Sequence, residues 1–285
     1  MSQRLKNPAT FPAAAESLAA SLSTVSRATA APVALRLAAR AMSTSFRVVS
    51  GRSARVMRAV WTASVRGNLS SSAVAGAGTD WFVTEADTPA VFRLSSGALA
   101  ANWLQSTDPD VEASNLQMVY STNDGKTWSK PFLPHHDGTK TQHAFAALFE
   151  TANKGLGVVW LDGRQTVKDR ESGPMSLRYA AFDDKWKQQA DVAIDTKVCD
   201  CCTTSVATTS DGLITAYRDR TDDEIRDIYV SRMEGTTWTP GTPVHADNWK
   251  IPACPINGPA ISARGKDVVV AWFTTKDDQG QSFAV

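Results

Sequence analysis

Arginine, aspartate and histidine side chains gather at short spacings in the second half of the chain. Arg164 follows Asp162 by two residues, and a second group runs from Arg218 to Arg226. A guanidinium group makes two charge-assisted hydrogen bonds to a carboxylate where an ammonium group makes one, so clustered arginines fit an acidic ligand. In the alternative interpretation, ion pairs such as Asp162 with Arg164 only hold loops together. The candidate ligand-binding residues are Arg164, Arg218, Arg220, Arg226 and His143.

The four cysteines are the most distinctive local feature. Cys199, Cys201 and Cys202 lie close together, and Cys254 follows much later. An even number of clustered cysteines favours disulfides in an exported protein, for instance one bridge from the first group to Cys254. A thiolate metal site, with a histidine as a further ligand, and reduced core thiols are the alternatives, but Cys-x-Cys-Cys is not the usual zinc spacing. We therefore predict disulfides, no bound metal and no cofactor.

These residues belong to a repeated element. An alternating apolar run that ends on an aromatic residue occurs four times, at Trp103, Trp160, Tyr217 and Trp272, with steps of 57, 57 and 55 residues. A fixed period of about this length, with short strands and an aromatic residue in each unit, is typical of a β-propeller. An ordinary β-sandwich with scattered tryptophans is the alternative.

Each repeat is predicted to form a blade of four antiparallel strands, A innermost to D outermost. In such a blade the B–C and D–A connections lie on one face, and the A–B and C–D turns lie on the other. The arginines, histidine and cysteines named above fall in B–C or D–A connections, so function is expected on that face. The predicted strands are 90–94, 98–104, 116–121 and 129–133; 144–149, 157–161, 177–182 and 188–194; 204–208, 213–217, 228–232 and 242–244; and 260–262 and 268–273.

One C–D turn carries a recognisable motif. An apolar alternation enters a polar Asn-Asp-Gly reversal and a Thr-Trp pair leaves it, which indicates a β-hairpin. The stretch resembles the Asp-box of the sialidase (neuraminidase) superfamily, Ser-x-Asp-x-Gly-x-Thr-Trp. In that family the acidic side chain caps the turn and the Trp packs beneath it. The matching residues are Ser121, Asn123, Asp124, Gly125 and Trp128, with Asn123 at the usual Asp position.

The resemblance covers about residues 85–285 and implies an all-β propeller of sialidase type, with exo-α-sialidase activity on an acidic carbohydrate ligand. Sialidases use three arginines, an Asp acid/base and a Tyr nucleophile, and Asp110, Asp162 and Asp219 are the candidates for the Asp. The chain departs from the family where Asp87-Thr88-Pro89 replaces Arg-Ile-Pro, and Tyr217 stands at a core position. The alternatives are a non-catalytic propeller that binds glycan or protein, and a metal protein centred on the cysteines.

Charge divides the chain into two parts. Residues 1–79 hold nine Arg, one Lys and one acidic residue, whereas residues 80–285 hold 20 basic and 28 acidic residues, a net charge of −8. We predict a basic Ala-, Ser- and Arg-rich leader over 1–79, disordered or partly helical near 34–42; a targeting segment or non-native residues are the alternatives. Its best apolar window is too short and too charged for a membrane span or a clear signal peptide.

Residues 80–285 supply about three and a half blades. We therefore expect a fragment of a longer protein, or self-association through open propeller edges. The formal net charge of +1 gives no reason to expect a nucleic-acid partner. Cysteine content and the family resemblance favour an exported location.

Overall fold

The computed structural model describes residues 44–48, 57–65, 68–78, 80–82, 86–108, 112–169, 173–276 and 279–284, with side chains between residues 74 and 275. The described residues all belong to one compact unit, Met42–Val285. The helix expected near 34–42 lies outside them. Among the described residues, no helix is long and apolar enough to cross a membrane.

A three-stranded antiparallel sheet precedes the predicted propeller. It consists of β1 (Thr44–Val48), β2 (Met57–Val65) and β3 (Asn68–Gly78), in that order. The sequence analysis placed these residues in the leader and predicted no strand there, because frequent Arg and Ser obscure a period of two. A Cβ added at Gly76 would come within 2.9 Å of the Trp103 ring, so β3 approaches the next sheet closely. The boundary at residue 80 remains a prediction.

Four further antiparallel sheets follow, and the strands predicted from the repeat are confirmed to within a few residues, with one exception. The outer strand expected at 129–133 is reduced to a single pairing of Phe132 with Met118. The strands are β4 (Ala90–Arg93), β5 (Leu99–Asp108) and β6 (Ala113–Ser121); β7 (His143–Glu150), β8 (Leu156–Asp162), β9 (Met175–Phe182) and β10 (Gln188–Val198); β11 (Ser205–Thr209), β12 (Gly212–Arg218), β13 (Ile228–Glu234), β14 (Thr237–Trp238) and β15 (Thr242–Pro243); and β16 (Ala260–Arg264), β17 (Asp267–Lys276) and β18 (Gln279–Ala284).

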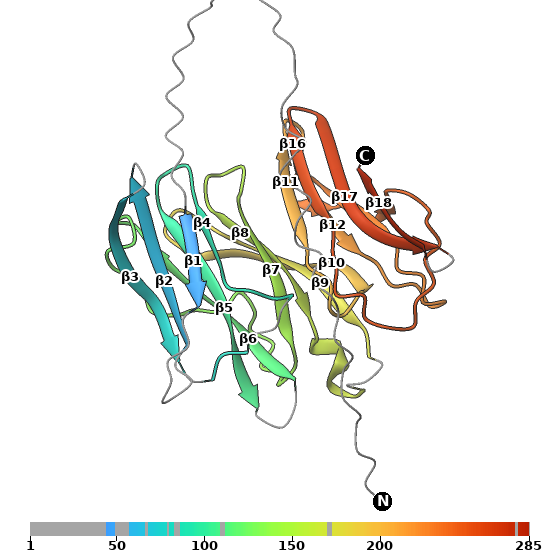
Figure 1. The fold of residues 1–285 in the computed structure, drawn as a ribbon, viewed down its shortest axis with the longest axis horizontal. Coiled ribbons are helices and arrows are strands. Elements are labelled where there is room, and N and C mark those ends of the chain that lie inside the picture. Colours follow the sequence, from blue (N-terminus) through green and yellow to red (C-terminus); the bar gives the residue numbers. More distant parts are fainter. Residues whose placement is uncertain are drawn as a thin grey trace, which may run out of the picture. The chain divides into compact units, whose positions relative to one another are not determined.

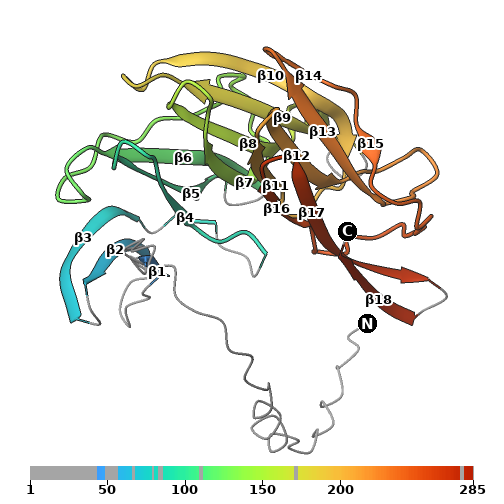
Figure 2. The same ribbon diagram turned by 90° about the horizontal axis from the view of Figure 1, so that it is seen from above.

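The first strand of each sheet faces the first strand of the next. β4 contacts β7, β7 contacts β11, and β11 contacts β16. The two ribbon views show these sheets succeeding one another in chain order (Figures 1 and 2). This is the arrangement of blades in a propeller, with the A strands innermost.

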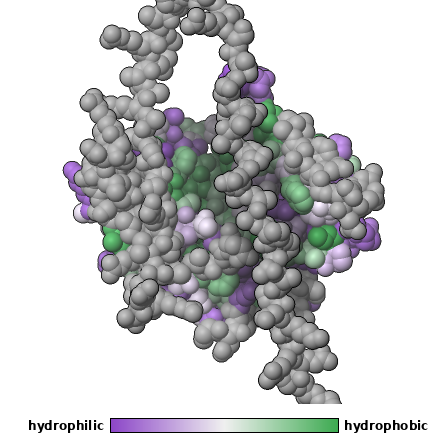
Figure 3. Space-filling model, in the orientation of Figure 1, coloured by the Kyte–Doolittle hydropathy of each residue, from purple (hydrophilic) through white to green (hydrophobic). Residues whose placement is uncertain are grey.

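The main hydrophobic core lies between the first three of these sheets. Trp160 is fully buried in it, and Leu116, Leu156 and Leu177 are buried around it. Toward the inner strands burial is less complete, since Val91 and Phe92 of β4 and Leu148 of β7 are only half-buried. The space-filling view accordingly shows a recessed hydrophobic area near the middle and hydrophilic residues at the margins (Figure 3).

Phe145 joins three sheets at the start of β7. It lies in a β-bulge between Ala144 and Ala147 and has a φ of 55°, which is uncommon for a residue other than glycine. Its N–H donates to the carboxylate of Asp87, and its carbonyl accepts a hydrogen bond of 2.9 Å from Oγ1 of Thr204. The inner ends of three repeats are therefore held together by one residue.

The turn after β6 is held by side-chain hydrogen bonds. Asn123 Oδ1 accepts the backbone N–H of Thr127 at 2.9 Å, and Ser121 Oγ accepts that of Gly125 at 2.9 Å. Asp124 adopts a φ of 62° and pairs with Arg93 of the inner strand at 2.6 Å. Trp128 is only partly buried, so the Trp beneath this turn is less enclosed than the sequence resemblance implies.

Asn123→Ala should lower the free energy of unfolding by about 1 kcal/mol, because the turn loses an acceptor for a backbone N–H. Urea denaturation followed by tryptophan fluorescence measures this change. Asn123→Asp keeps the acceptor and should leave the stability nearly unchanged. Equal losses in both variants would contradict the capping role.

Candidate functional site

The B–C and D–A connections carry two polar clusters. The histidine–aspartate cluster lies where the first two predicted blades meet. The cysteine–arginine cluster lies between the sheet of the third predicted blade, β11–β15, which we call the third sheet, and its neighbours. The first consists of His135, Asp137, His143, Asp162 and Arg164. The second consists of Cys199, Asp200, Cys201, Cys202, Arg218, Arg220, Glu224, Arg226, Cys254 and Asn257.

His143 is fully buried at the centre of the first cluster. Its Nδ1 lies 2.9 Å from the carbonyl of Ser114, and its Nε2 lies 3.0 Å from Asp137 Oδ2. Because a carbonyl can only accept, Nδ1 carries a proton, and a further proton is shared between Nε2 and the Asp137 carboxylate. The ring also stacks on that of His135, with centroids 3.7 Å apart.

The side chain of Arg164 holds Asp162 through two hydrogen bonds, and its backbone N–H donates a third at 3.0 Å. Arg164 Nε and Nη2 each donate to one carboxylate oxygen at 2.7 Å, and Trp160 Nε1 donates to Oδ2 at 2.9 Å. Burial acts to raise the pKa of Asp162, but the hydrogen bonds and charge of Arg164, with the charge of His143, hold it below its usual range. Asp162 is thus a buried, ionised carboxylate whose acceptor positions are in use.

His135 and Asp137, the other two members of this cluster, also have lowered pKa values. Burial, reinforced by the charge of His143, lowers the pKa of His135 to about 3, so this ring is neutral near pH 7. For Asp137, burial opposes ionisation, but hydrogen bonds from Thr139 and the charges of His143 and Arg164 place the pKa well below its ordinary value.

Donor atoms of His135, Asp137 and His143 lie within 4.8 Å of one another, a spacing that a metal ion could use. However, His135 Nε2 accepts the N–H of Leu116 at 3.3 Å, which leaves the proton on the Nδ1 that faces Asp137. Arg164 Nη2 also lies 3.4 Å from Asp137 Oδ2 and supplies positive charge. The chemistry of these groups therefore favours a closed proton-sharing network.

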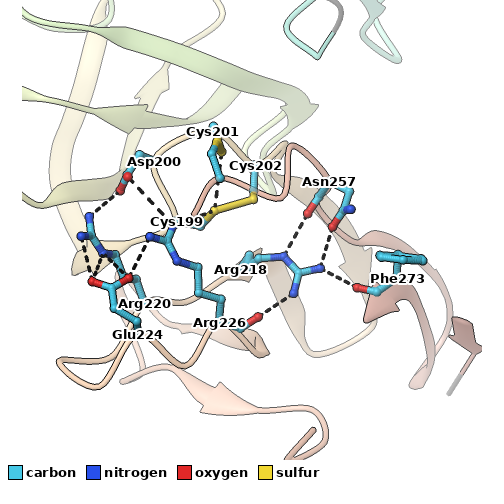
Figure 4. The surroundings of a disulfide bond; sticks show 11 residues. Cys199, Asp200, Cys201, Cys202, Arg218, Arg220, Glu224, Arg226, Asn257 and Phe273 are labelled. Carbon is cyan, nitrogen blue, oxygen red and sulfur yellow. Dashed lines mark hydrogen bonds and ion pairs between the residues drawn. A yellow bond between two sulfur atoms is a disulfide. The ribbon is translucent and has the colours of Figure 1, made fainter. Parts of the chain in front are cut away.

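The cysteines form two disulfides, as the sequence predicted. Cys199 pairs with Cys202, and Cys201 pairs with Cys254 of the following D–A connection. Figure 4 shows the Cys199–Cys202 bond with Cys201 beside it, and Arg226 pointing toward Cys199. The second bond joins the loops that flank the third sheet.

Arg220 and Arg226 share an acidic partner. Arg220 Nε and Nη2 donate to Glu224, and Nη1 donates to Asp200 at 3.0 Å. Arg226 Nη2 donates to Oε2 of the same Glu224 at 2.9 Å (Figure 4). Both guanidinium groups are therefore neutralised within the protein.

Arg218 points away from these residues and binds mainly backbone carbonyls. Its Nε donates to the carbonyl of Asn257 at 3.0 Å, one Nη2 hydrogen bond of 2.7 Å reaches the carbonyl of Phe273, and Nη1 donates to that of Arg226 (Figure 4). The guanidinium also lies 4.9 Å from the ring centroid of Trp249. Burial lowers the pKa of Arg218 to about 10, so it remains charged near pH 7. For this residue the loop-tying alternative describes the contacts observed.

Asp195 and Asp219 lie on the two sides of the seam between β10 and the end of β12, where Val198 pairs with Asp219. Asp195 Oδ2 accepts the hydroxyl of Tyr217 at 2.7 Å, and Asp219 follows Tyr217 by two residues. Burial, with the nearby charge of Asp195, raises the pKa of Asp219 to about 7. Burial and the same acid raise the pKa of Tyr217, which therefore stays protonated and is a poor nucleophile.

The predicted residues are thus divided between places. The structure brings together His143, Asp162 and Arg164, and separately Arg218, Arg220 and Arg226, whereas Asp110 lies outside the described residues. Asp137 and Asp195 were expected in D–A connections on the functional face but were not among the predicted site residues. Asp137 stands in the short run His135-His136-Asp137, which was the available signal, and Asp195 starts the connection predicted after strand 188–194.

No protein-family model matches the chain, and no curated protein matches it in sequence. Several solved structures are similar to it. A polysaccharide lyase of family PL25, an ulvan lyase, has a TM-score of 0.52 at 11% identity over 80% of this chain and 57% of its own, so this chain spans little more than half of that lyase. A GH93 α-L-arabinofuranosidase of Fusarium graminearum gives 0.48 at 13% identity over 80% and 77%, and a protein of unknown function from Dyadobacter fermentans gives 0.46 at 17% over 81% and 75%.

At 11% identity the likeness to the lyase concerns the fold alone. It supports an all-β chain of antiparallel sheets arranged as in a propeller. The lyase is not a sialidase, so the sialidase family, its Asp-box and its catalytic residues remain predictions.

Proposed function

We propose that this chain is a carbohydrate-active propeller, a glycoside hydrolase in which Asp219 and Asp195 act as a pair of carboxyl groups. The observation that carries the proposal is the place of Asp219 beside the end of β10, where it bridges Val198 and where burial and the charge of Asp195, the acceptor of the Tyr217 hydroxyl, raise its pKa. Most glycosidases place two carboxyl groups on either side of the bond to be cleaved. The solved propeller-type structures with a lyase or an arabinofuranosidase activity support the same class of substrate.

The two carboxyl groups are suited to different roles. Asp219 is 9% exposed and holds its proton up to about pH 7, which fits a general acid that protonates the leaving oxygen. Asp195 is more exposed and would serve as the base or nucleophile. Tyr217, by donating to Asp195 Oδ2, fixes the orientation of that carboxylate.

An acidic glycan, and exo-α-sialidase activity in particular, is the finer form of this proposal. Arg220 lies 11% exposed beside the partly exposed Asp200 and Glu224, so a ligand carboxylate could displace one of these acids. The ulvan lyase has also been solved with a bound glucuronic acid–sulfated rhamnose unit, an acidic sugar. The two disulfides fit an exported protein.

A non-catalytic propeller that binds glycan or protein is the second candidate. It is favoured by the pairing of Arg164, Arg220 and Arg226 with internal acids, since these arginines then organise loops. Self-association through open propeller edges belongs to this alternative.

Asp219→Asn should lower turnover at least about 100-fold, the usual contribution of a general acid. The assay uses fluorogenic sialosides and arabinosides and the polysaccharide ulvan, and wild-type activity should fall as the pH rises through about 7. Asp211→Asn is the matched control, because Asp211 pairs with Lys266 at an A–B turn. Glycan binding without turnover in the wild-type chain would instead support the second candidate.

The effect of Asp219→Asn on stability can be measured without any substrate. The pKa of Asp219 lies above its ordinary value of 3.8, so ionisation opposes folding and stability is lost as the pH rises from about 4 to about 7. Asparagine does not ionise. Asp219→Asn should therefore gain stability relative to the wild type over this range, as measured by urea denaturation at several pH values; a constant difference would contradict the raised pKa.

A further inference from the structure

Four cysteine sulfurs meet where the D–A connections on either side of the third sheet approach each other. Cys199 Sγ lies 4.0 Å from Cys201 Sγ, to which it is not bonded, and the sulfurs of Cys199, Cys201 and Cys202 all lie within 4.8 Å of one another. Cys254 joins them through its bond to Cys201. Three of the four sulfurs thus lie close together, and the fourth is bonded to one of them.

A buried cation is directed at these sulfurs. Arg226 is 3% exposed, and its Nη1 donates to Cys199 Sγ at 3.5 Å. Among the described residues, its Nε is buried and has no hydrogen-bond partner. Nη2 of Arg226 donates to Glu224 at 2.9 Å, and Nη1 also lies 3.9 Å from Asp200 Oδ2. A disulfide sulfur is neutral and a weak acceptor, so the oxidised cluster gives Nη1 only a weak hydrogen bond and Nε none. An anionic sulfur at Cys199 would be a far stronger partner, and a buried group left unsatisfied calls for such an explanation.

We propose that the reduced form of this cluster binds one thiophilic d10 cation, Zn²⁺ or Cu⁺, through the sulfurs of Cys199, Cys201, Cys202 and Cys254. In a tetrahedral site with Zn–S bonds of about 2.3 Å, neighbouring sulfurs lie about 3.8 Å apart. The Cys199–Cys201 separation of 4.0 Å is close to that value before any movement. Arg226 then becomes an outer donor to a metal-bound thiolate, the kind of contact that tunes such sites.

Metal uptake requires two steps, reduction of the two disulfides and then binding of the cation. Two molecules of a dithiol reductant each cleave one protein disulfide, giving four cysteine thiols and two oxidised reductants. The cation then replaces the four thiol protons, which leave to solvent. Cys254 is exposed and Cys201 is half-buried, so attack by a thiolate begins at that bond, and the buried Cys199–Cys202 bond follows.

The test is metal binding by the full chain, free of any glycan assay. After anaerobic reduction by a dithiol and removal of the reductant, the protein is incubated with Zn²⁺ or, separately, with Cu⁺, desalted and analysed for metal. We expect about one equivalent of the preferred ion in the reduced protein and none in the oxidised protein or in the double variant Cys199→Ser/Cys201→Ser. Co²⁺ in place of Zn²⁺ should give the thiolate charge-transfer and visible bands of a tetrahedral site. Binding of neither ion above the level of the double variant would overturn the proposal.

Two further measurements address the guanidinium and the fold. Arg226→Gln should weaken metal affinity about 10- to 100-fold in competition with a chelator. Arg220→Gln, which removes a neighbouring guanidinium with no hydrogen bond to sulfur, should leave it unchanged. If reduction unfolds the chain, addition of the ion should restore the near-ultraviolet circular dichroism. A chain that stays unfolded with both ions, or equal affinities in the two arginine variants, would count against the proposal.

Discussion

Replacing Arg218 with methionine is expected to lower the free energy of unfolding by about 3 to 5 kcal/mol. Arg218 is 1% exposed, and its donors serve three backbone carbonyls and the side chain of Asn257. Methionine fills much of the same space but donates nothing, so several buried acceptors lose their partner at once. The acceptors come from two loops and from β17, so the loss affects the packing of the third sheet against the fourth.

Urea denaturation of the full chain, with the disulfides intact, measures this change. Arg220→Met is the matched control, because its partners Asp200 and Glu224 are partly exposed and the expected loss is about 1 kcal/mol or less. If Arg218→Met kept the wild-type stability but lost binding of an acidic sugar, Arg218 would be a ligand-binding residue, as the sequence predicted.

Asp162→Asn is expected to lower the free energy of unfolding by about 3 to 5 kcal/mol. The substitution removes the fully buried negative charge that faces Arg164 and His143, so their positive charge loses a partner. Thermal and urea denaturation at pH 7 measure the loss. The double variant Asp162→Asn/Arg164→Met removes both charges and should recover part of it. The same loss in both variants would show that the ion pair itself is not the cause.

The pH dependence supplies a control for this cluster. The pKa values of Asp162 and Asp137 lie below the ordinary value of 3.8. The two carboxylates therefore stabilise the folded state above about pH 4, and this stabilisation is lost as the pH falls through their lowered pKa values. Asp162→Asn should therefore differ from the wild type much less at pH 2 than at pH 7. Asp191→Asn, which breaks the partly exposed pair with Arg178, should cost about 1 kcal/mol or less.

The strands of the repeats could be predicted because their signal is local. Alternation in β5, β8, β12 and β17 ends on an aromatic residue at a fixed period, and turn residues mark where each hairpin reverses. β1 to β3 escaped prediction because their polar and arginine-rich sequence lacks a clear apolar alternation. The outer strand at 129–133 was over-predicted, since local propensity could not show that only Phe132 pairs with β6.

The candidate site was harder to predict, because its contacts join residues of different repeats. Asp162 and Arg164 are neighbours in sequence, and their pairing could be foreseen as an ion pair. The contact of His143 with Asp137 depends on how the connection before β7 folds back, which no spacing encodes. A bridge to Cys254 was predicted and is confirmed, but four cysteines permit three connectivities, so Cys201 could not be chosen in advance.

The Cys201–Cys254 bond also bears on how the chain opens and closes. It spans 53 residues and encloses the whole third sheet, from β11 to β15. Repeat proteins open one unit at a time, usually from an end, and a crosslink of this span removes about 4 kcal/mol of entropy from the unfolded ensemble. With the bond intact, the two flanking loops cannot separate when strands of the third sheet open, so reclosing is fast. Amide hydrogen exchange should therefore be slow in β12 and β13 and much faster in β17. Reduction of the Cys201–Cys254 bond should make the two exchange rates more similar.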